Sequence, residues 1–192
     1  MYKRQRQLLA ARLTSAEMTV ALVTHDPLDV WALADRVIAL DAGQVSAEGE
    51  VGALLGRPQT RFLAELSGVN LISGRATATA EQFAVTVGES LVTGLWDGSR
   101  PAQLDHHALA TFPPAAVALF TEEPHGSPRN TWRVRVTGID PRGATVRVLL
   151  ELPDGQPLTA DLTAQGVAAL GVRIGDSVLA QVKATQVTLY PR

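Results

Sequence analysis

The 192-residue sequence has no cysteine and no long apolar run. Without cysteine there can be no disulfide, no thiolate metal ligand and no cysteine nucleophile. No apolar run approaches the roughly 20 residues of a membrane span. The basic first residues also lack the continuous apolar core of a signal peptide. We therefore expect a cytoplasmic protein.

The sequence also lacks an excess of either charge and is poor in aromatic residues. The chain has seventeen basic and nineteen acidic residues, and aromatic residues make up 5% of it. A net charge of −2 creates no general attraction for nucleic acid, so we expect no nucleic-acid partner and only a local anion site. The three tryptophans are too far apart in sequence to suggest a stacking platform for bases. A hydrophobic content of 46% is enough to build folded cores.

The first 68 residues mix helical and strand patterns. Residues 3–16 place leucines at helical spacing and leave basic residues for a solvated face. The apolar, β-branched run Met18–Val23 is typical of a buried parallel strand. Residues 36–49 predict two strands joined by a turn at Ala42-Gly43, followed by two short helices. The basic residues of the first helix are Lys3, Arg4, Arg6 and Arg12.

A helix is predicted directly after His25. Asp26 is a suitable N-cap, Pro27 fits the first helical position, and Asp29 brings negative charge to the first turn. His25 would then lie at the carboxyl end of the sheet, where open α/β folds bind ligands. On position alone, a structural role for this histidine remains the commoner alternative.

From residue 69 the pattern changes to short alternating strands separated by Gly, Pro and Asp. One helix, from Thr163 to a Gly171 stop, interrupts the strands. The fold class predicted is an α/β fragment over residues 1–68, then an all-β, OB-like barrel region with one short helix over 69–192. The best-defined barrel is expected over 109–192, and no period repeats strictly enough to predict a solenoid.

The stretch "VTHDPLDVWALADRVIALDAGQVSAEG" resembles the C-terminal part of an ABC-transporter ATPase domain. The shared features are a strand leading to a histidine, a helix with an acidic residue and Ala-Asp-Arg, and a hairpin turning at a glycine. The resemblance implies that His25 is the catalytic switch histidine, which contacts the γ-phosphate of ATP and helps to position the attacking water. The resemblance further implies ATP with Mg²⁺ as the cofactor of the intact family subunit, and we expect no cofactor in this chain alone.

Other parts of an ATPase site are absent from this sequence. It contains no G-x-x-x-x-G-K-[ST] loop to hold phosphates, no Leu-Ser-Gly-Gly signature and no apolar strand ending in Asp-Glu before His25. The stretch "LSGVN" (66–70) is interpreted as a chance echo of the signature. We therefore predict that this chain alone neither binds ATP tightly nor hydrolyses it.

Two later segments, residues 122–139 and 176–190, resemble the molybdate-binding TOBE, or Mop, domain. The family pattern has Ser-Ala-Arg-Asn before the first barrel strand and Lys-Ala-[Ser/Thr] near the last. Here Pro128 replaces the usual alanine and removes one backbone N–H. The resemblance implies that the oxyanion-binding residues are Ser127, Arg129, Asn130, Lys183, Ala184 and Thr185.

The residue types at these positions suit a tetrahedral dianion, which needs converging donors and positive charge. Ser127 offers a hydroxyl, Arg129 and Lys183 offer charged donors, and Thr185 with nearby backbone N–H groups could complete the shell. The set fits molybdate, tungstate or sulfate. The alternative is that both cations are solvated and that Ser127-Pro128 is a plain turn.

No metal site is predicted. Adjacent side chains in a strand point to opposite faces, and no ligand spacing supports His106-His107, which we interpret as a loop pair. His125 lies beside Ser127 and is equally suited to touch the anion or to be a solvated turn residue.

The hypothesis that covers most of the chain is the C-terminal, regulatory portion of the ATP-binding subunit of a molybdate or tungstate ABC importer. It implies a homodimer, in which oxyanions bind where two barrels meet, and permease subunits as membrane partners. The protein would then be peripheral to the inner face of the cell membrane. Two alternatives stay open: a free-standing molybdate-binding or storage module, and the tail of a sugar or sulfate importer ATPase.

Overall fold

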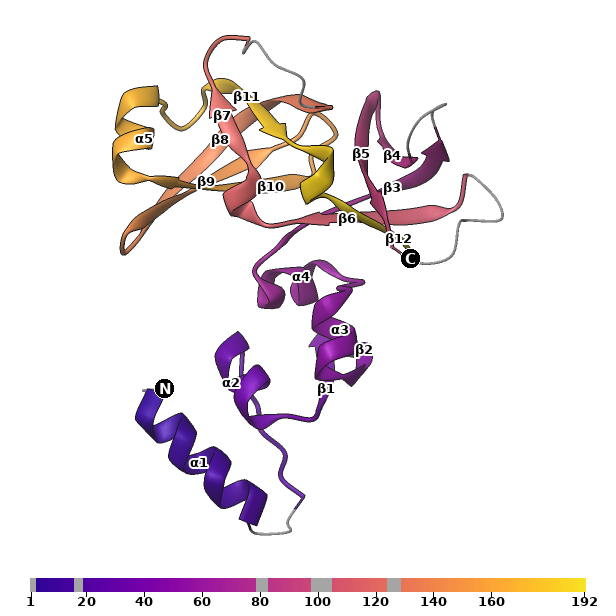
Figure 1. The fold of residues 1–192 in the computed structure, drawn as a ribbon, viewed down its shortest axis with the longest axis vertical. Helices are drawn as coiled ribbons and strands as arrows, with labels where there is room; N and C mark the ends of the chain where they lie inside the picture. Colours follow the sequence, from indigo (N-terminus) through magenta and orange to yellow (C-terminus); the bar gives the residue numbers. More distant parts are fainter. Residues whose placement is uncertain (1–2, 16–18, 79–82, 98–104, 124–128) are drawn as a thin grey trace. The chain divides into compact units, whose positions relative to one another are not determined.

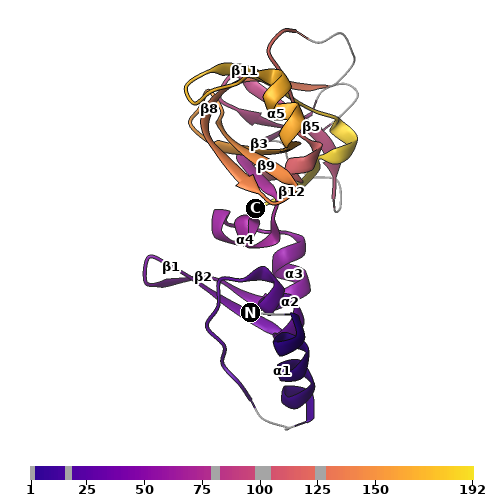
Figure 2. The ribbon, with the colours of Figure 1, turned by 90° about the vertical axis from the view of Figure 1, so that its left-hand side faces the viewer.

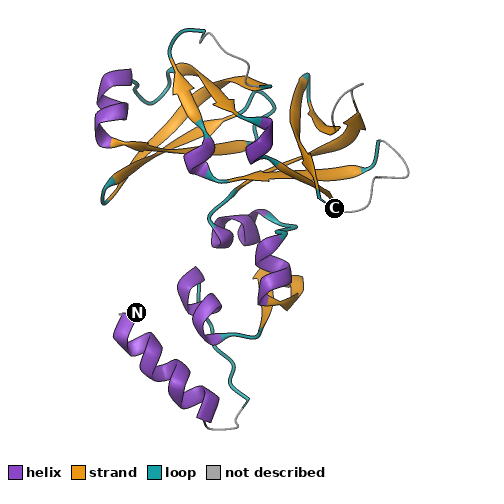
Figure 3. Cartoon of the chain, viewed as in Figure 1, coloured by secondary structure: helices purple, strands orange, loops and turns teal. Residues whose placement is uncertain are grey.

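The computed structural model describes residues 3–15, 19–78, 83–97, 105–123 and 129–192. The chain divides into two compact units, Met1–Gly68 and Val69–Arg192. The first unit contains four helices and one hairpin in its described residues, whereas the second is built mainly from strands (Figure 3). Among the helices of the described ranges, none has the length and apolar character needed to cross a membrane.

The first unit follows the predicted order of elements except at one strand. Ala42 and Gly43 form the predicted tight turn, with φ angles of 48° and 78°, as a two-residue hairpin turn requires. The elements are α1 (Lys3–Ser15), α2 (Pro27–Leu33), β1 (Arg36–Asp41), β2 (Gln44–Glu50), α3 (Val51–Gly56) and α4 (Arg61–Ser67).

The prediction of a buried parallel strand at Met18–Val23 is wrong. Met18 lies outside the described residues, and Thr19–Val23 has no regular structure, with Val23 fully exposed. A parallel strand is stabilised by neighbours on both sides. In the described part of this unit, the strands are the antiparallel pair β1 and β2, and neither pairs with this segment. The segment therefore has the apolar pattern of a strand, but within the described residues it has no strand to pair with.

In its described residues, the second unit contains two five-stranded sheets. One is a closed barrel with the strand order β12-β5-β4-β3-β6, and the other has the order β10-β9-β8-β11-β7 (Figures 1 and 2). Helix α5 (Ala164–Leu170) packs on β9 and β10 and begins and ends as predicted, at Thr163 and Gly171. The strands are β3 (Asn70–Ala78), β4 (Phe83–Val87), β5 (Ser90–Trp96), β6 (His107–Phe112), β7 (Ala118–Phe120), β8 (Asn130–Arg142), β9 (Thr145–Glu151), β10 (Pro157–Thr163), β11 (Ser177–Val182) and β12 (Thr188–Pro191).

The strand pairing differs from the single barrel expected over residues 109–192. Strand β6 and the last strand, β12, both belong to the closed barrel with β3, β4 and β5. Strand β7, which follows β6 in the chain, instead pairs with β11. Each sheet is therefore completed by a short strand that comes, along the chain, directly after a strand of the other sheet. His107, interpreted from the sequence as part of a loop, begins strand β6.

This exchange reveals an internal duplication, which we call repeat 1 (residues 69–120) and repeat 2 (residues 129–191). In repeat 1, β6 leads through the 3₁₀ turn η1 (Pro114–Ala116) into β7, and in repeat 2, β11 leads through η2 (Ala184–Gln186) into β12. The registers match as well, because Leu119 pairs with Ala180 while Leu189 pairs with Ala110. Sequence analysis missed this repeat because few side chains are identical.

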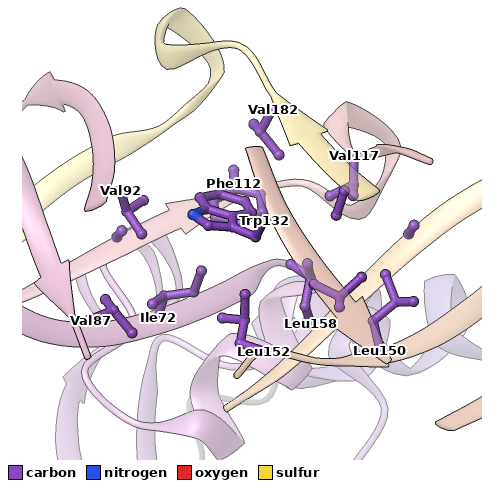
Figure 4. Packing of buried hydrophobic residues seen from close by; sticks show 14 of the residues in the cluster. Ile72, Val87, Val92, Phe112, Val117, Trp132, Leu150, Leu152, Leu158 and Val182 are labelled. Carbon is purple, nitrogen blue, oxygen red and sulfur yellow. The ribbon is translucent and has the colours of Figure 1, made fainter. Parts of the chain in front are cut away.

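One hydrophobic core joins both repeats (Figure 4). The rings of Phe112 and Trp132 stack with their centroids 6.1 Å apart at an interplanar angle of 24°. Counting from the asparagines that begin β3 and β8, Trp132 occupies the position that Ile72 occupies in repeat 1. Counting from the ends of β6 and β11, Phe112 likewise corresponds to Val182. Phe112 of repeat 1 thus packs against Trp132 of repeat 2, whereas the equivalent positions hold the smaller Val182 and Ile72.

A bidentate ion pair links β9 and β10 on the surface of the second sheet. Nε and Nη2 of Arg147 each lie 2.7 Å from a carboxylate oxygen of Asp161, and the two residues are direct cross-strand partners. The hydrogen bond from Arg147 lowers the pKa of the Asp161 carboxyl below its ordinary value of 3.8. A carboxyl with a lowered pKa stabilises the fold above the unfolded-state pKa, and this contribution is lost as the pH falls through the folded-state pKa.

We expect Asp161→Asn to lower the free energy of unfolding by roughly 1 kcal/mol at pH 7, with the difference from wild type shrinking as the pH falls through the folded-state pKa of Asp161. Urea unfolding at pH 7 and pH 2.5 measures this. Glu151→Gln is the matched control, because its pair with Arg135 is more exposed, with side-chain exposures of 38% and 62%. An equal loss at both pH values would contradict a charge-based contribution.

Candidate oxyanion site

The structure brings two of the predicted site segments together at one end of two neighbouring strands. Asn130 begins β8, Val182 ends β11, and the two residues are direct antiparallel partners. Arg129 and Lys183 extend the chain beyond this pair in opposite directions along the sequence, so they follow at the same end of the sheet. Both residues are exposed. The predicted site residue Ser127 lies outside the described residues, as do Pro128 and His125.

A tight turn presents the second segment at the surface. Lys183 is extended, with φ −70° and ψ 135°, and immediately precedes η2. The N–H of Gln186 donates to the carbonyl of Lys183 over 2.9 Å, and the N–H of Val187 donates to the carbonyl of Ala184 over 3.2 Å. Ala184 is half-buried, whereas Thr185 is exposed on the same turn. The turn therefore fixes the backbone of the three predicted residues and leaves the lysine and threonine side chains at the surface.

Asn130 has a different environment from its cationic neighbours. Its side chain is completely buried. The amide Oδ1 accepts a hydrogen bond from the N–H of Thr93 over 2.7 Å, and Nδ2 donates to the carbonyl of Thr93 over 2.9 Å. The amide thus binds the backbone of β5 in repeat 1. It fixes the start of β8, and with it the position of Arg129, from inside the protein.

Asn70 makes the reciprocal contact from repeat 1. Its Nδ2 donates to the carbonyl of Thr159 over 2.9 Å, and its Oδ1 accepts from the N–H and the hydroxyl of Thr159 over 2.8 and 2.9 Å. We call these two contacts the asparagine clamps. Sequence reasoning dismissed "LSGVN" as chance, yet its last residue is Asn70. The shared Ser-x-x-Asn of residues 67–70 and 127–130 was the signal that could have revealed the repeat.

His25 is exposed and precedes the N-cap of α2, where the Asp26 side chain accepts from the N–H of Leu28 over 2.8 Å. The Arg6 side chain, predicted to be solvated, is instead only 11% exposed and bonds both Asp26 and Asp29. The hydrogen bond from Arg6 lowers the pKa of the Asp29 carboxyl. The described residues around α2 thus include an ion-pair cluster that fixes the helix start.

Histidines and carboxylates do not form a metal site in the described ranges, since no cluster of three or more potential ligands occurs there. His106 lies edge-on to Trp96, with ring centroids 6.0 Å apart. This geometry is that of an aromatic contact.

The fold and the segment pairing define the class of this region. Residues 126–189 match the family model of the TOBE domain. A solved structure of the cytoplasmic molybdate-binding protein ModG is similar in fold, with a TM-score of 0.54. At 23% sequence identity, the similarity covers 62% of this chain and 94% of that one.

Whole-chain comparisons are more specific. The chain is 38% identical over 97% of its length to the molybdenum import ATP-binding protein ModC of Mycobacterium tuberculosis, covering 50% of that protein. It is 29% identical over 90% of its length to the molybdate/tungstate import ATP-binding protein WtpC of Pyrococcus horikoshii, covering 47% of it. The chain therefore spans about half the length of the curated relatives it matches. The resemblance recognised in the sequence is confirmed.

We expect Asn130→Ala and Asn70→Ala each to lower the free energy of unfolding by about 2 kcal/mol, because each removes the side-chain partner of a backbone N–H and carbonyl, those of buried Thr93 and half-buried Thr159. Denaturant unfolding measures this. Thr131→Ala, at the exposed position after Asn130, is the control and should stay within about 0.5 kcal/mol of wild type. Clamp variants as stable as the control would show that the amides are not needed.

Proposed function

We propose that this chain is the regulatory portion of a molybdate or tungstate importer's ATP-binding subunit and that its TOBE domain binds the oxyanion. The observation that carries the proposal is the placement of Arg129 and Lys183 at one end of the paired strands β8 and β11. The names of the relatives, molybdenum and molybdate/tungstate import ATP-binding proteins, indicate which anions to test first.

The chemistry of these groups suits a tetrahedral dianion. The planar guanidinium of Arg129 can offer two parallel N–H donors, and the ammonium of Lys183 offers a compact positive charge. The Thr185 hydroxyl, on the turn after Lys183, is a neutral donor at the same surface. Ser127 remains a predicted ligand. The Asn130 amide is not used as a ligand, because Thr93 already engages both of its polar atoms.

The exposure of these residues supports a second part of the proposal, a homodimer. An anion held by exposed cations on one side keeps water on its other side, and this water screens the attraction. A second copy of the chain that covers the site would remove that water and add donors. In the intact subunit, oxyanion bound here would act on a machine driven by ATP and coupled to membrane permease subunits.

The residues of this chain do not fit ATP itself. The sequence has no phosphate-binding loop, and the switch-histidine candidate His25 is exposed beside a helix whose first-turn carboxylate, Asp29, is already paired with Arg6. We therefore assign no step of ATP hydrolysis to this chain by itself.

Molybdate and tungstate should raise the melting temperature of the purified chain more than sulfate or maltose does. A ligand at 100 times its Kd stabilises the folded state by about 2.7 kcal/mol. Arg129→Ala and Lys183→Ala should each weaken molybdate binding about tenfold or more, as the loss of a charge-assisted hydrogen bond predicts. Isothermal titration calorimetry measures this.

Arg133→Ala is the matched control, since Arg133 is an exposed arginine on β8, four residues after Arg129, and it should bind as wild type does. Preference for sulfate would favour a sulfate importer. No response to any oxyanion, or wild-type binding by both cation variants, would overturn the proposed site.

We also expect no sustained ATP hydrolysis by the purified chain, because the groups that hold phosphates and magnesium are absent from its sequence. Phosphate release measured with Mg-ATP should equal the rate of a His25→Ala variant. A wild-type rate clearly above that of the variant would contradict this expectation.

A further inference from the structure

We propose that repeat 1 contains a latent second oxyanion site, which has the strand end and the 3₁₀ turn of the site in repeat 2 but lacks its two cations and the hydroxyl of Thr185. The native chain then binds oxyanion only at repeat 2. This inference rests on the proposed function. It follows from the internal duplication, which gives each repeat an equivalent strand end and an equivalent 3₁₀ turn.

The strand ends are equivalent in register. In repeat 2 the first residue of β8, Asn130, pairs with the last residue of β11, Val182. In repeat 1 the first residue of β3, Asn70, pairs with the last residue of β6, Phe112. Each asparagine is buried and clamps a threonine backbone of the other repeat. The position that corresponds to Arg129 is therefore Val69, one residue before the clamp.

The turns that follow have the same backbone. Pro113 has φ −69° and ψ 146°, close to the −70° and 135° of Lys183. In both turns the second hydrogen bond is 3.2 Å long, from the N–H of Val117 to the carbonyl of Pro114 and from Val187 to Ala184. The position that corresponds to Lys183 is therefore Pro113.

The side chains at these positions differ in positive charge and in hydroxyl groups, which are what a dianion needs for binding. Repeat 1 has Val69 for Arg129, Pro113 for Lys183 and Ala115 for Thr185. Pro113 and Ala115 are exposed, as Lys183 and Thr185 are. At this strand end of repeat 1, these three positions offer neither a positive charge nor a hydroxyl. A dianion gains too little there to offset the loss of its hydration.

The equivalence makes the latent site testable by gain of function. The triple variant Val69→Arg, Pro113→Lys, Ala115→Thr restores the three side chains. Lysine adopts the backbone angles of Pro113 without strain, because Lys183 has nearly the same angles. Val69 is half-buried, so Pro113→Lys, Ala115→Thr alone serves as a second variant that changes exposed positions only. Urea unfolding establishes that both variants are folded.

The experiment counts molybdate bound per chain by equilibrium dialysis and elemental analysis, in the exposed double variant and in four other proteins, each with all 192 residues. These are the wild type, the loss variant Arg129→Ala, Lys183→Ala, the triple variant, and the combination of loss and triple variants. We expect the loss variant to bind essentially none, the triple variant to bind twice as much as wild type at saturation, and the combination to match wild type. The exposed double variant should add the same second class of sites, about tenfold weaker.

Three results would overturn the inference, and they are distinguishable. A loss variant that keeps half of the wild-type molybdate shows that repeat 1 binds without these groups. Folded triple and double variants that bind no more than wild type show that the shared backbone is not a site. If the wild type binds no molybdate, the proposed function fails, and the latent site fails with it.

Discussion

The second unit depends on the reciprocal exchange of two short strands between its repeats. Strand β7 completes the sheet of repeat 2, and β12 completes the barrel of repeat 1. The asparagine clamps act in the same two directions, since Asn70 binds Thr159 and Asn130 binds Thr93. Buried amides that satisfy backbone groups are costly to remove. Each repeat therefore needs the other to complete its sheet and to provide hydrogen-bond partners for its clamped backbone groups.

The asparagine clamps and the strand exchange also position the candidate site. Asn130 fixes the start of β8 from within the protein, and the next residue toward the N-terminus is Arg129 at the surface. Lys183 lies across the strand pair, at the start of a turn that leads into the exchanged strand β12. Arg129 and Lys183 both belong to repeat 2, but groups of both repeats hold them in position. A rigid frame of this kind lowers the entropy that an anion must offset on binding.

Local signals predicted the local elements well. The cap at Asp26, the turn at Ala42-Gly43 and the helix ending at Gly171 all appear in the structure. The failures concern partners. Met18–Val23 has the pattern of a buried strand, but among the described residues no strand pairs with Thr19–Val23. An apolar pattern shows that a segment is suited to a buried strand. It does not show that another strand is available to pair with it.

The sequence alone determined the residue chemistry of the candidate site, because charge and hydroxyl content are properties of side chains at known positions. It also determined the likeness to importer subunits, which the comparisons confirm. Only the tertiary structure decided that Asn130 is an internal clamp, that β12 belongs with the strands of repeat 1 and that two equivalent strand ends exist. These facts depend on hydrogen bonds between residues far apart in the chain, which no local pattern encodes.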